Sequence, residues 1–101
     1  MNSITSDVLL DRYIKDALLI IDVRSKDEFK IKHIPNTYNI PYDFLIQSCL
    51  KYLNFDKIYY IICDNGNLSK NACNFLNSKG FKTINITDGI SSWRGPLTNN
   101  S

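Results

Sequence analysis

The chain has 101 residues, close to the common size of one folded domain, so a single hydrophobic core must support the whole function. Hydrophobic residues make up 44% of the chain and charged residues 22%, a balance that excludes a disordered segment. The formal net charge of +2 comes from charges spread along the chain, which excludes the basic stripe that nucleic acid requires.

Targeting and cysteine patterns indicate a reduced, membrane-free setting. Residues 1–7 lack the basic start and apolar run of a signal peptide, and no apolar stretch is long enough to span a membrane. We therefore expect one cytoplasmic domain over residues 1–101. The three cysteines, at positions 49, 63 and 73, are an odd number without metal-ligand spacing, so we expect free thiols and no metal site.

Short apolar runs alternate with segments of helical spacing, which is typical of an α/β domain built on a parallel sheet. Ser6 is expected to cap a first helix that runs through Ile14, and residues 18–23 are predicted to form a buried strand. Ser25 and Glu28 then have the form of a capping box, which predicts a short helix directly after that strand.

The middle of the chain is divided by prolines. Pro35 and Pro41 prevent a continuous helix, so a loop with one short strand is expected between them. Residues 42–53 carry apolar side chains at helical spacing and are predicted to form one helix. Residues 58–62 are β-branched or aromatic throughout and form the clearest predicted strand.

The last third of the chain continues the alternation. A helix is predicted over residues 69–79, with Gly80 able to take the left-handed conformation that ends it. Residues 81–87 are predicted to form the last strand, followed by a short helical turn that ends near Trp93. Residues 97–101 are expected to be a loose tail.

Cys63 is the candidate for chemistry because it directly follows the strand predicted over residues 58–62. In open α/β sheets the ligand crevice lies at the carboxyl ends of the strands. The loop after this cysteine consists of Asp64, Asn65, Gly66, Asn67, Leu68 and Ser69. Glycine and asparagine tolerate turns in which successive amides point at one spot and bind an anion. Such amides, together with the positive end of the next helix, favour a thiolate and would stabilise a terminal persulfide.

The alternative for each cysteine is a structural role, since free cysteine often acts only as a small buried apolar side chain. This interpretation is favoured for Cys49 and Cys73, which lie on apolar faces of predicted helices. For Cys63 the local pattern leaves both interpretations open.

Several short fragments occur in a specific order and spacing along the chain. They are Asp22-Val23-Arg24, Glu28-Phe29, His33-Ile34-Pro35, Asn39-Ile40-Pro41, Cys63 with Gly66 and Ser69, and Asp88-Gly89 with Trp93. Together they resemble the rhodanese-like family over nearly the whole chain. The resemblance implies a three-layer α/β domain with a central, mostly parallel sheet of four to five strands flanked by helices. It also implies a catalytic cysteine, matched by Cys63, that takes sulfane sulfur from a donor and passes it to a thiol acceptor without a cofactor.

One position departs from the family pattern. Active members commonly have arginine at the fifth residue after the cysteine, and here that residue is Leu68, while acidic Asp64 lies next to the thiol. Leucine cannot supply the charge or the forked hydrogen bonds that a guanidinium offers to the sulfonate end of thiosulfate. We therefore expect weak thiosulfate activity, and Lys70 is not expected to replace the missing cation.

The remaining fragments are interpreted mainly as structural. Asp22 and Arg24 are expected to bind neighbouring loops or each other, although Arg24 is also a possible pocket residue. His33 is expected to fix a loop through a hydrogen bond rather than to act as a base. Trp93 is expected to pack over the end of the sheet.

Three functions remain open at this point. The first is sulfur transfer through a persulfide on Cys63, performed by a monomer whose sulfane-sulfur donor and thiol acceptor are small molecules or proteins. The alternative is a catalytically impaired rhodanese-like module for binding or regulation, which Leu68 favours. Cysteine phosphatase chemistry ranks below both, because it needs an arginine at the transition state.

Overall fold

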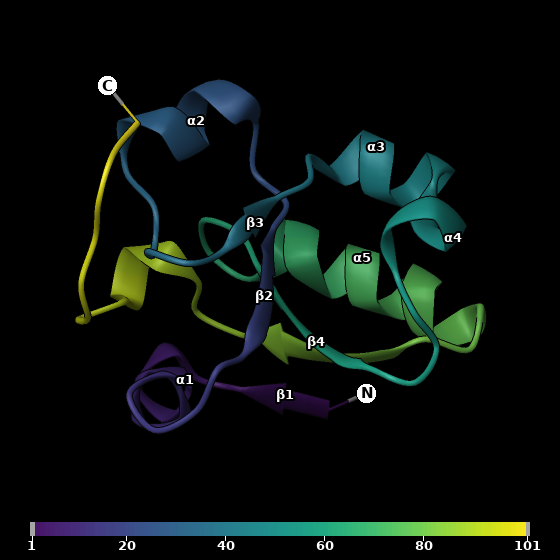
Figure 1. Ribbon diagram of the computed structural model, residues 1–101, viewed down its shortest axis with the longest axis horizontal. Helices are drawn as coiled ribbons and strands as arrows, with labels where there is room; N and C mark the ends of the chain where they lie inside the picture. The colour runs from purple at the N-terminus through teal and green to yellow at the C-terminus, as the bar shows by residue number, and fades with distance from the viewer. Residues whose placement is uncertain (1, 101) are drawn as a thin grey trace.

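The computed structural model describes residues 2–100 and contains one five-stranded sheet in which every neighbouring pair is parallel (Figure 1). The strands are β1 (Asn2–Ile4), β2 (Leu19–Asp22), β3 (Tyr38–Asn39), β4 (Ile58–Ile62) and β5 (Lys82–Ile86), in the spatial order β1-β5-β4-β2-β3. The helices are α1 (Ser6–Tyr13), α2 (Lys26–Ile31), α3 (Tyr42–Gln47), α4 (Cys49–Tyr52), α5 (Asn67–Ser78) and the 3-10 helix η1 (Ile90–Ser92). The expected parallel α/β architecture is confirmed.

The sheet separates two hydrophobic cores, because successive side chains of a strand point to opposite faces. Ile61 and Cys63 enter the core that α3 and α5 cover, whereas Tyr60 and Ile62 enter the core beneath α1 and η1. Figure 1 shows this division, with α1 at the lower left and α3, α4 and α5 on the right. The side chain of Cys63 therefore lies on the α5 face of the sheet.

The single helix expected over residues 42–53 is divided into α3 and α4 at Ser48, whose φ of −131° is not helical. The amide of Ser48 closes α3 by donating to the carbonyl of Phe44, and its own carbonyl accepts from Lys51 in the next turn. Apolar spacing continues across this break, so periodicity alone could not locate it. Within residues 2–100, no helix has both the length and the apolar character needed to cross a bilayer.

The first residues of the chain form an edge strand that the sequence pattern did not predict. β1 pairs with β5, so it depends on a partner from the far end of the chain. The cap of α1 is Thr5, whose hydroxyl accepts from the amide of Val8, and not Ser6 as expected. Ser6 is instead buried and donates its hydroxyl to the carbonyl of Gly89 at 2.6 Å.

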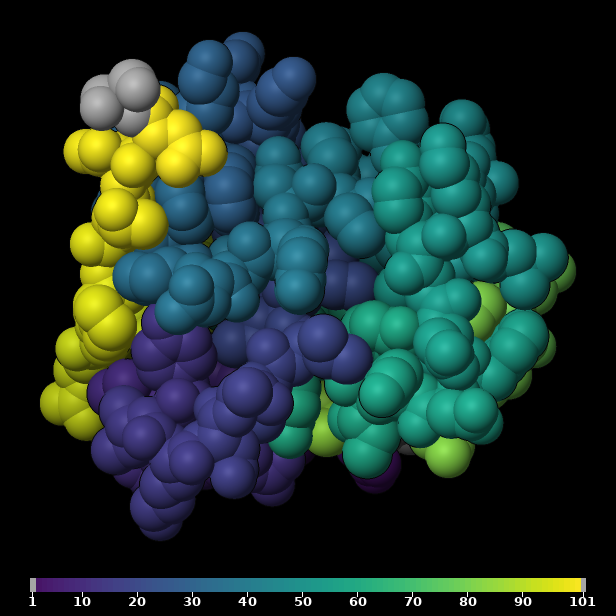
Figure 2. All heavy atoms as spheres, in the orientation of Figure 1, coloured from purple at the N-terminus to yellow at the C-terminus, as the bar shows by residue number. Residues whose placement is uncertain are grey.

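The end of the chain is attached to the loop after α2 instead of lying free. Thr98 pairs with His33 through two backbone hydrogen bonds, and the amide of Asn100 donates to the carbonyl of Lys30. Figure 2 shows these last residues, in yellow, running along the surface beside the blue α2 region. The expected loose tail over residues 97–101 is thus replaced by a bound segment through position 100, and Ser101 lies outside the described residues.

Candidate active site

Cys63 lies at the carboxyl end of β4, one of the inner strands of the sheet, and α5 begins four positions later at Asn67. The connection from β4 to α5 therefore has to turn back within a few residues. Because the first amides of a helix have no partner inside that helix, they are free to bind a group placed at its start. The thiol of Cys63 lies at the start of α5, within reach of these amides.

Two backbone amides converge on the sulfur of Cys63. The N–H groups of Gly66 and Ser69 each donate to Sγ at 3.2 Å. Ser69 is the third residue of α5, so its amide belongs to the positive end of a 12-residue helix. Amide donors and a helix N-terminus together stabilise sulfur in its anionic form, which is the nucleophilic form of a cysteine.

The turn that aims these amides requires a glycine at position 66. Gly66 has a φ of +92°, which L side chains rarely adopt. A Cβ at this position would also collide with the carbonyl oxygen of Thr87, at the end of β5. The loop is therefore pressed against the neighbouring strand in a conformation that any other residue would strain.

A second turn, formed by residues 87–92, supports the first residues of the loop. The amide of Ile90 donates to the carbonyl of Cys63 at 2.9 Å, and the amide of Ser91 donates to the carbonyl of Asp64 at 3.0 Å. Gly89 leaves no room for a Cβ against the same two carbonyls. These contacts fix the carbonyl groups of Cys63 and Asp64 at the start of the loop.

A buried polar network continues from the sulfur to β5. The hydroxyl of Ser69 lies 3.3 Å from Sγ of Cys63 and donates to Oδ1 of Asn85. The sequence interpretation did not identify Asn85. A signal was present, because Asn85 and Thr83 are polar residues that alternate with isoleucine in a strand otherwise suited to burial.

The other loop residues face outward to different degrees. Asp64, Asn65 and Asn67 are exposed, and Oδ1 of Asn65 accepts from the amide of Asn67 at 3.1 Å. Leu68 is 37% exposed. Lys70 lines a cavity of about 300 Å³ together with Gly66 and Asn67. The loop thus directs backbone amides at the sulfur, and its side chain at position 68 is uncharged and partly exposed to solvent.

Arg24 is buried, and its guanidinium is engaged with other groups. It forms three hydrogen bonds with the carboxylate of Asp22 at 2.8 to 3.1 Å, and it donates to the carbonyl of Lys32 at 2.8 Å. Burial alone would lower the pKa of Arg24, but the hydrogen bonds and charge of Asp22 outweigh it, with smaller help from Glu28 and Asp64, so the pKa is raised. Arg24 therefore remains cationic, and Asp22 already neutralises its charge.

The other two cysteines lie within the core on the α5 face. Cys73 is fully buried, and that burial raises the pKa of its thiol to about 11 despite an opposing hydrogen bond with Thr83. Cys49 is half-buried at the start of α4. Both positions match the packing role expected for them.

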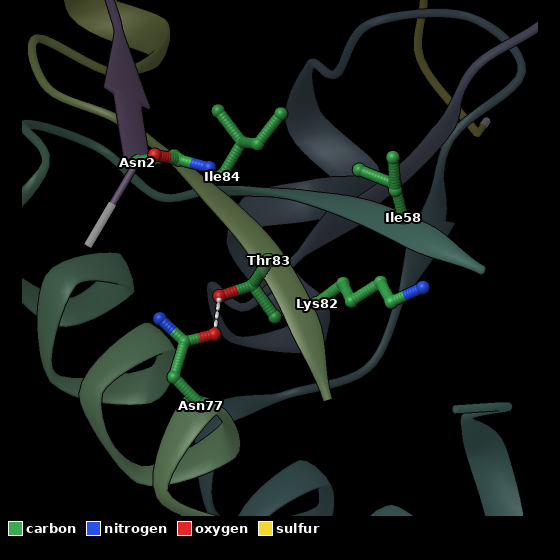
Figure 3. Close-up of a pocket in the computed structure, with 6 residues that line it drawn as sticks. All are labelled: Asn2, Ile58, Asn77, Lys82, Thr83 and Ile84. Carbon is green, nitrogen blue, oxygen red and sulfur yellow. Dashed lines mark hydrogen bonds between the residues drawn. The ribbon is translucent and has the colours of Figure 1, made fainter. Parts of the chain in front are cut away.

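A cavity of about 320 Å³ lies at the opposite end of the sheet from Cys63 (Figure 3). Its lining includes Asn2, Ile58 and Lys82, which stand at the amino ends of β1, β4 and β5. The dashed line in Figure 3 is the 2.7 Å hydrogen bond from the hydroxyl of Thr83 to Asn77. Since the thiol lies beyond the carboxyl end of β4, this cavity is separate from the candidate active site.

Fold and site together define a parallel α/β domain with a thiol held in an amide-lined loop between a strand and a helix. The sequence model described as "Rhodanese-like domain" matches residues 5–96. Because this match covers most of the chain, the protein belongs to the rhodanese-like family.

Individual relatives support this assignment. "Putative sulfurtransferase YtwF" of Bacillus subtilis is 35% identical over 80 residues, which cover 79% of this chain and 77% of that protein. "Putative sulfur carrier protein YrkF" of the same organism is 35% identical over 81 residues, covering 79% of this chain and 43% of that protein. A rhodanese-like domain protein from Staphylococcus aureus has a crystal structure with a TM-score of 0.91 and 33% identity, with both chains fully covered.

Proposed function

We propose that this protein transfers sulfur through a persulfide formed on Cys63. The observation that carries the proposal is the convergence of the Gly66 and Ser69 amides on Sγ, each at 3.2 Å. These donors favour the nucleophilic thiolate, and no metal or cofactor is part of the proposed chemistry. Membership in the rhodanese-like family and relatives named as sulfurtransferases support the same reaction class.

The proposed cycle balances with thiols and sulfane sulfur alone. The Cys63 thiolate attacks the outer sulfur of a donor persulfide, a new S–S bond forms, and the donor leaves as a thiolate that takes up a proton. An acceptor thiolate then attacks the outer sulfur on Cys63, which breaks that S–S bond and restores the Cys63 thiolate. We propose that donor and acceptor are small molecules or proteins.

Intact mass measurement tests the first half of this cycle. The wild-type protein is incubated with a low-molecular-weight persulfide and weighed before and after addition of an acceptor thiol. We expect the mass of one sulfur atom to be added and then removed, and we expect Cys63→Ser to gain none. Absence of the addition on the wild type, or an equal addition on Cys63→Ser, would reject the proposal.

Leu68 supports a narrower proposal about the donor. An anionic donor such as thiosulfate has a sulfonate group that fork-like cationic donors bind well. Position 68 carries no charge here, and the guanidinium of Arg24, the pocket residue considered from the sequence, is bound to Asp22. We therefore propose that persulfides are better donors than thiosulfate for this protein.

A binding or regulatory role is the second candidate, and two observations favour it. Leu68 stands where the family commonly has arginine, and the Cys63 residue is only 2% exposed. In this case the fold recognises a partner and the thiol is structural. Cells that carry Cys63→Ala would then behave like the wild type, whereas sulfur transfer requires that they behave like cells lacking the protein.

A further inference from the structure

Asn85 is a polar side chain buried directly behind the candidate active-site loop. It extends from β5, is 3% exposed, and uses both ends of its amide group. Its Nδ2 faces the carbonyl oxygen of Gly66 at 3.4 Å, so its Oδ1 is the atom that faces the hydroxyl of Ser69. The opposite orientation of the amide would place two oxygens together, which makes the observed assignment the favourable one.

The Ser69 hydroxyl has more acceptors than it has protons. Its oxygen lies within hydrogen-bonding range of Oδ1 of Asn85, 3.2 Å from the carbonyl of Gly66, and 3.3 Å from Sγ of Cys63. A serine hydroxyl carries one hydrogen, so it can serve one of these acceptors well at a time. The Gly66 carbonyl already accepts from the amide of Lys70 at 3.1 Å. The competition is therefore mainly between Asn85 and the sulfur.

We propose that Asn85 is a positioning residue that holds the Ser69 hydroxyl proton away from the Cys63 sulfur. Its relevance to catalysis rests on the sulfur transfer proposed above. In the resting protein the thiol donates to the Ser69 oxygen, and Ser69 donates to Asn85. Once the sulfur is anionic it can accept a third hydrogen bond besides the two amides, but only if Ser69 releases Asn85.

The proposal has a consequence for reactivity. While Asn85 retains the hydroxyl proton, only the Gly66 and Ser69 amides stabilise the anionic sulfur. Removing the Asn85 acceptor frees the hydroxyl to turn toward the sulfur, where it would donate a third hydrogen bond to the anionic form. Asn85 does not touch the reacting atom, so any such effect must pass through Ser69.

A double-mutant cycle tests this dependence. The rate of Cys63 alkylation by iodoacetamide is measured against pH, with peptide mass spectrometry to separate Cys63 from Cys49 and Cys73. For Asn85→Leu, which removes the acceptor without opening a large void, we expect the half-maximal rate about 0.5 to 1 pH unit lower, as for one neutral hydrogen bond. In a Ser69→Ala background the same change should produce no shift.

The other charged or titratable groups near the thiol are common to both backgrounds. They include Asp64 in the loop, Arg24, whose charge interacts with Asp64, and Cys73, whose charge interacts with Cys63. Their influence therefore cancels when the two shifts are compared. An unchanged profile in Asn85→Leu, or an equal shift in both backgrounds, would overturn the proposal.

Asn85→Asp provides a second variant in case the leucine variant does not fold. A carboxylate keeps the acceptor for Ser69 and adds negative charge, so the half-maximal rate should move to higher pH. A shift to lower pH in this variant would contradict the proposal. Alkylation of Cys63 does not require sulfur transfer. If the wild-type protein is alkylated normally but takes up no sulfur, the proposed function is rejected, and the double-mutant cycle on Asn85 and Ser69 can still be interpreted.

Discussion

At the scale of single residues, the proposed preference for persulfides over thiosulfate depends on the side chain at position 68. Leu68 is the second residue of α5 and is 37% exposed beside the loop. We expect Leu68→Arg to raise the rate of sulfite release from thiosulfate by about tenfold or more, since one charge-assisted hydrogen bond is worth roughly 1.5 to 3 kcal/mol. Steady-state kinetics with thiosulfate and with a persulfide measure the change.

The matched control is Leu68→Met, which keeps the size and lacks the charge. It should leave the rate with thiosulfate near that of the wild type. If Leu68→Arg behaves like Leu68→Met while both still load sulfur from a persulfide, the loop holds its amides in place but does not admit a sulfonate at position 68.

Comparing two glycines at positive φ distinguishes the cost of backbone strain from the cost of a steric clash. Gly66 has φ +92° and no room for a Cβ beside Thr87, whereas a Cβ at Gly80, with φ +98°, would only touch the ring of Phe55 at 3.6 Å. Gly80→Ala should therefore cost about 1 to 2 kcal/mol of unfolding free energy from the backbone alone. Gly66→Ala should cost more, because the loop must also move away from β5.

Urea unfolding measures the stability of the two variants, and intact mass after incubation with a persulfide measures their sulfur loading. We expect Gly66→Ala to lose the persulfide on Cys63, because its amide no longer points at the sulfur, and Gly80→Ala to retain it. Equal stability losses in the two variants would show that the close approach to Thr87 contributes nothing.

At the scale of elements, the buried Arg24 side chain joins the end of β2 to the residue that follows α2. Arg24 binds the carboxylate of Asp22 and the carbonyl of Lys32, and all side-chain atoms of the pair are nearly inaccessible. Arg24→Leu leaves the Asp22 charge buried without its partner, so we expect a loss of about 3 to 5 kcal/mol. Chemical denaturation of the variant measures this loss.

An exposed ion pair elsewhere in the protein serves as the control for the buried one. Arg94 binds Asp7 at 3.0 Å, with side chains that are 77% and 59% exposed. Arg94→Leu should change the unfolding free energy by less than about 1 kcal/mol, because water and salt screen the exposed charges. Similar losses in the two variants would indicate that burial does not determine the strength of the Arg24 contact.

At the scale of the whole molecule, the buried Cys73 thiol makes stability fall at alkaline pH. Burial raises its pKa from an ordinary value of 9.0 to about 11 in the folded protein. Unfolded chains therefore lose this proton at a lower pH than folded ones do. The resulting stability is fully present below pH 9 and is lost as the pH rises toward 11, with a slope of at most about 1.4 kcal/mol per pH unit.

Cys73→Ala removes this titration, so the difference in slope between variant and wild type isolates the contribution of Cys73 from that of every other group. Urea unfolding at several pH values measures both slopes. Parallel stability curves for the two proteins would show that Cys73 does not contribute.

The spacing of apolar residues and the capping residues predicted most helices and strands correctly, because these signals depend on residues close together in the chain. The capping box of Ser25 and Glu28 is formed as expected, with both reciprocal hydrogen bonds present. The strand is formed over residues 58–62 and is directly followed by Cys63, as expected. The helix after the loop begins at Asn67 rather than Ser69, because Gly66 in the left-handed conformation starts it earlier. Local spacing cannot show where such a backbone conformation falls.

The amino-acid sequence by itself determined the parallel α/β class and the place of Cys63 at the end of a strand, because both depend on residues close together along the chain. It also indicated the family, because the order and spacing of short fragments can be read without knowing which segments pair in space. Tertiary structure alone decided the β1 edge strand, the bound segment through Thr98 and the contact of Asn85 with Ser69. These depend on pairing between segments that are distant in sequence, and such pairing leaves no periodic signal in either segment.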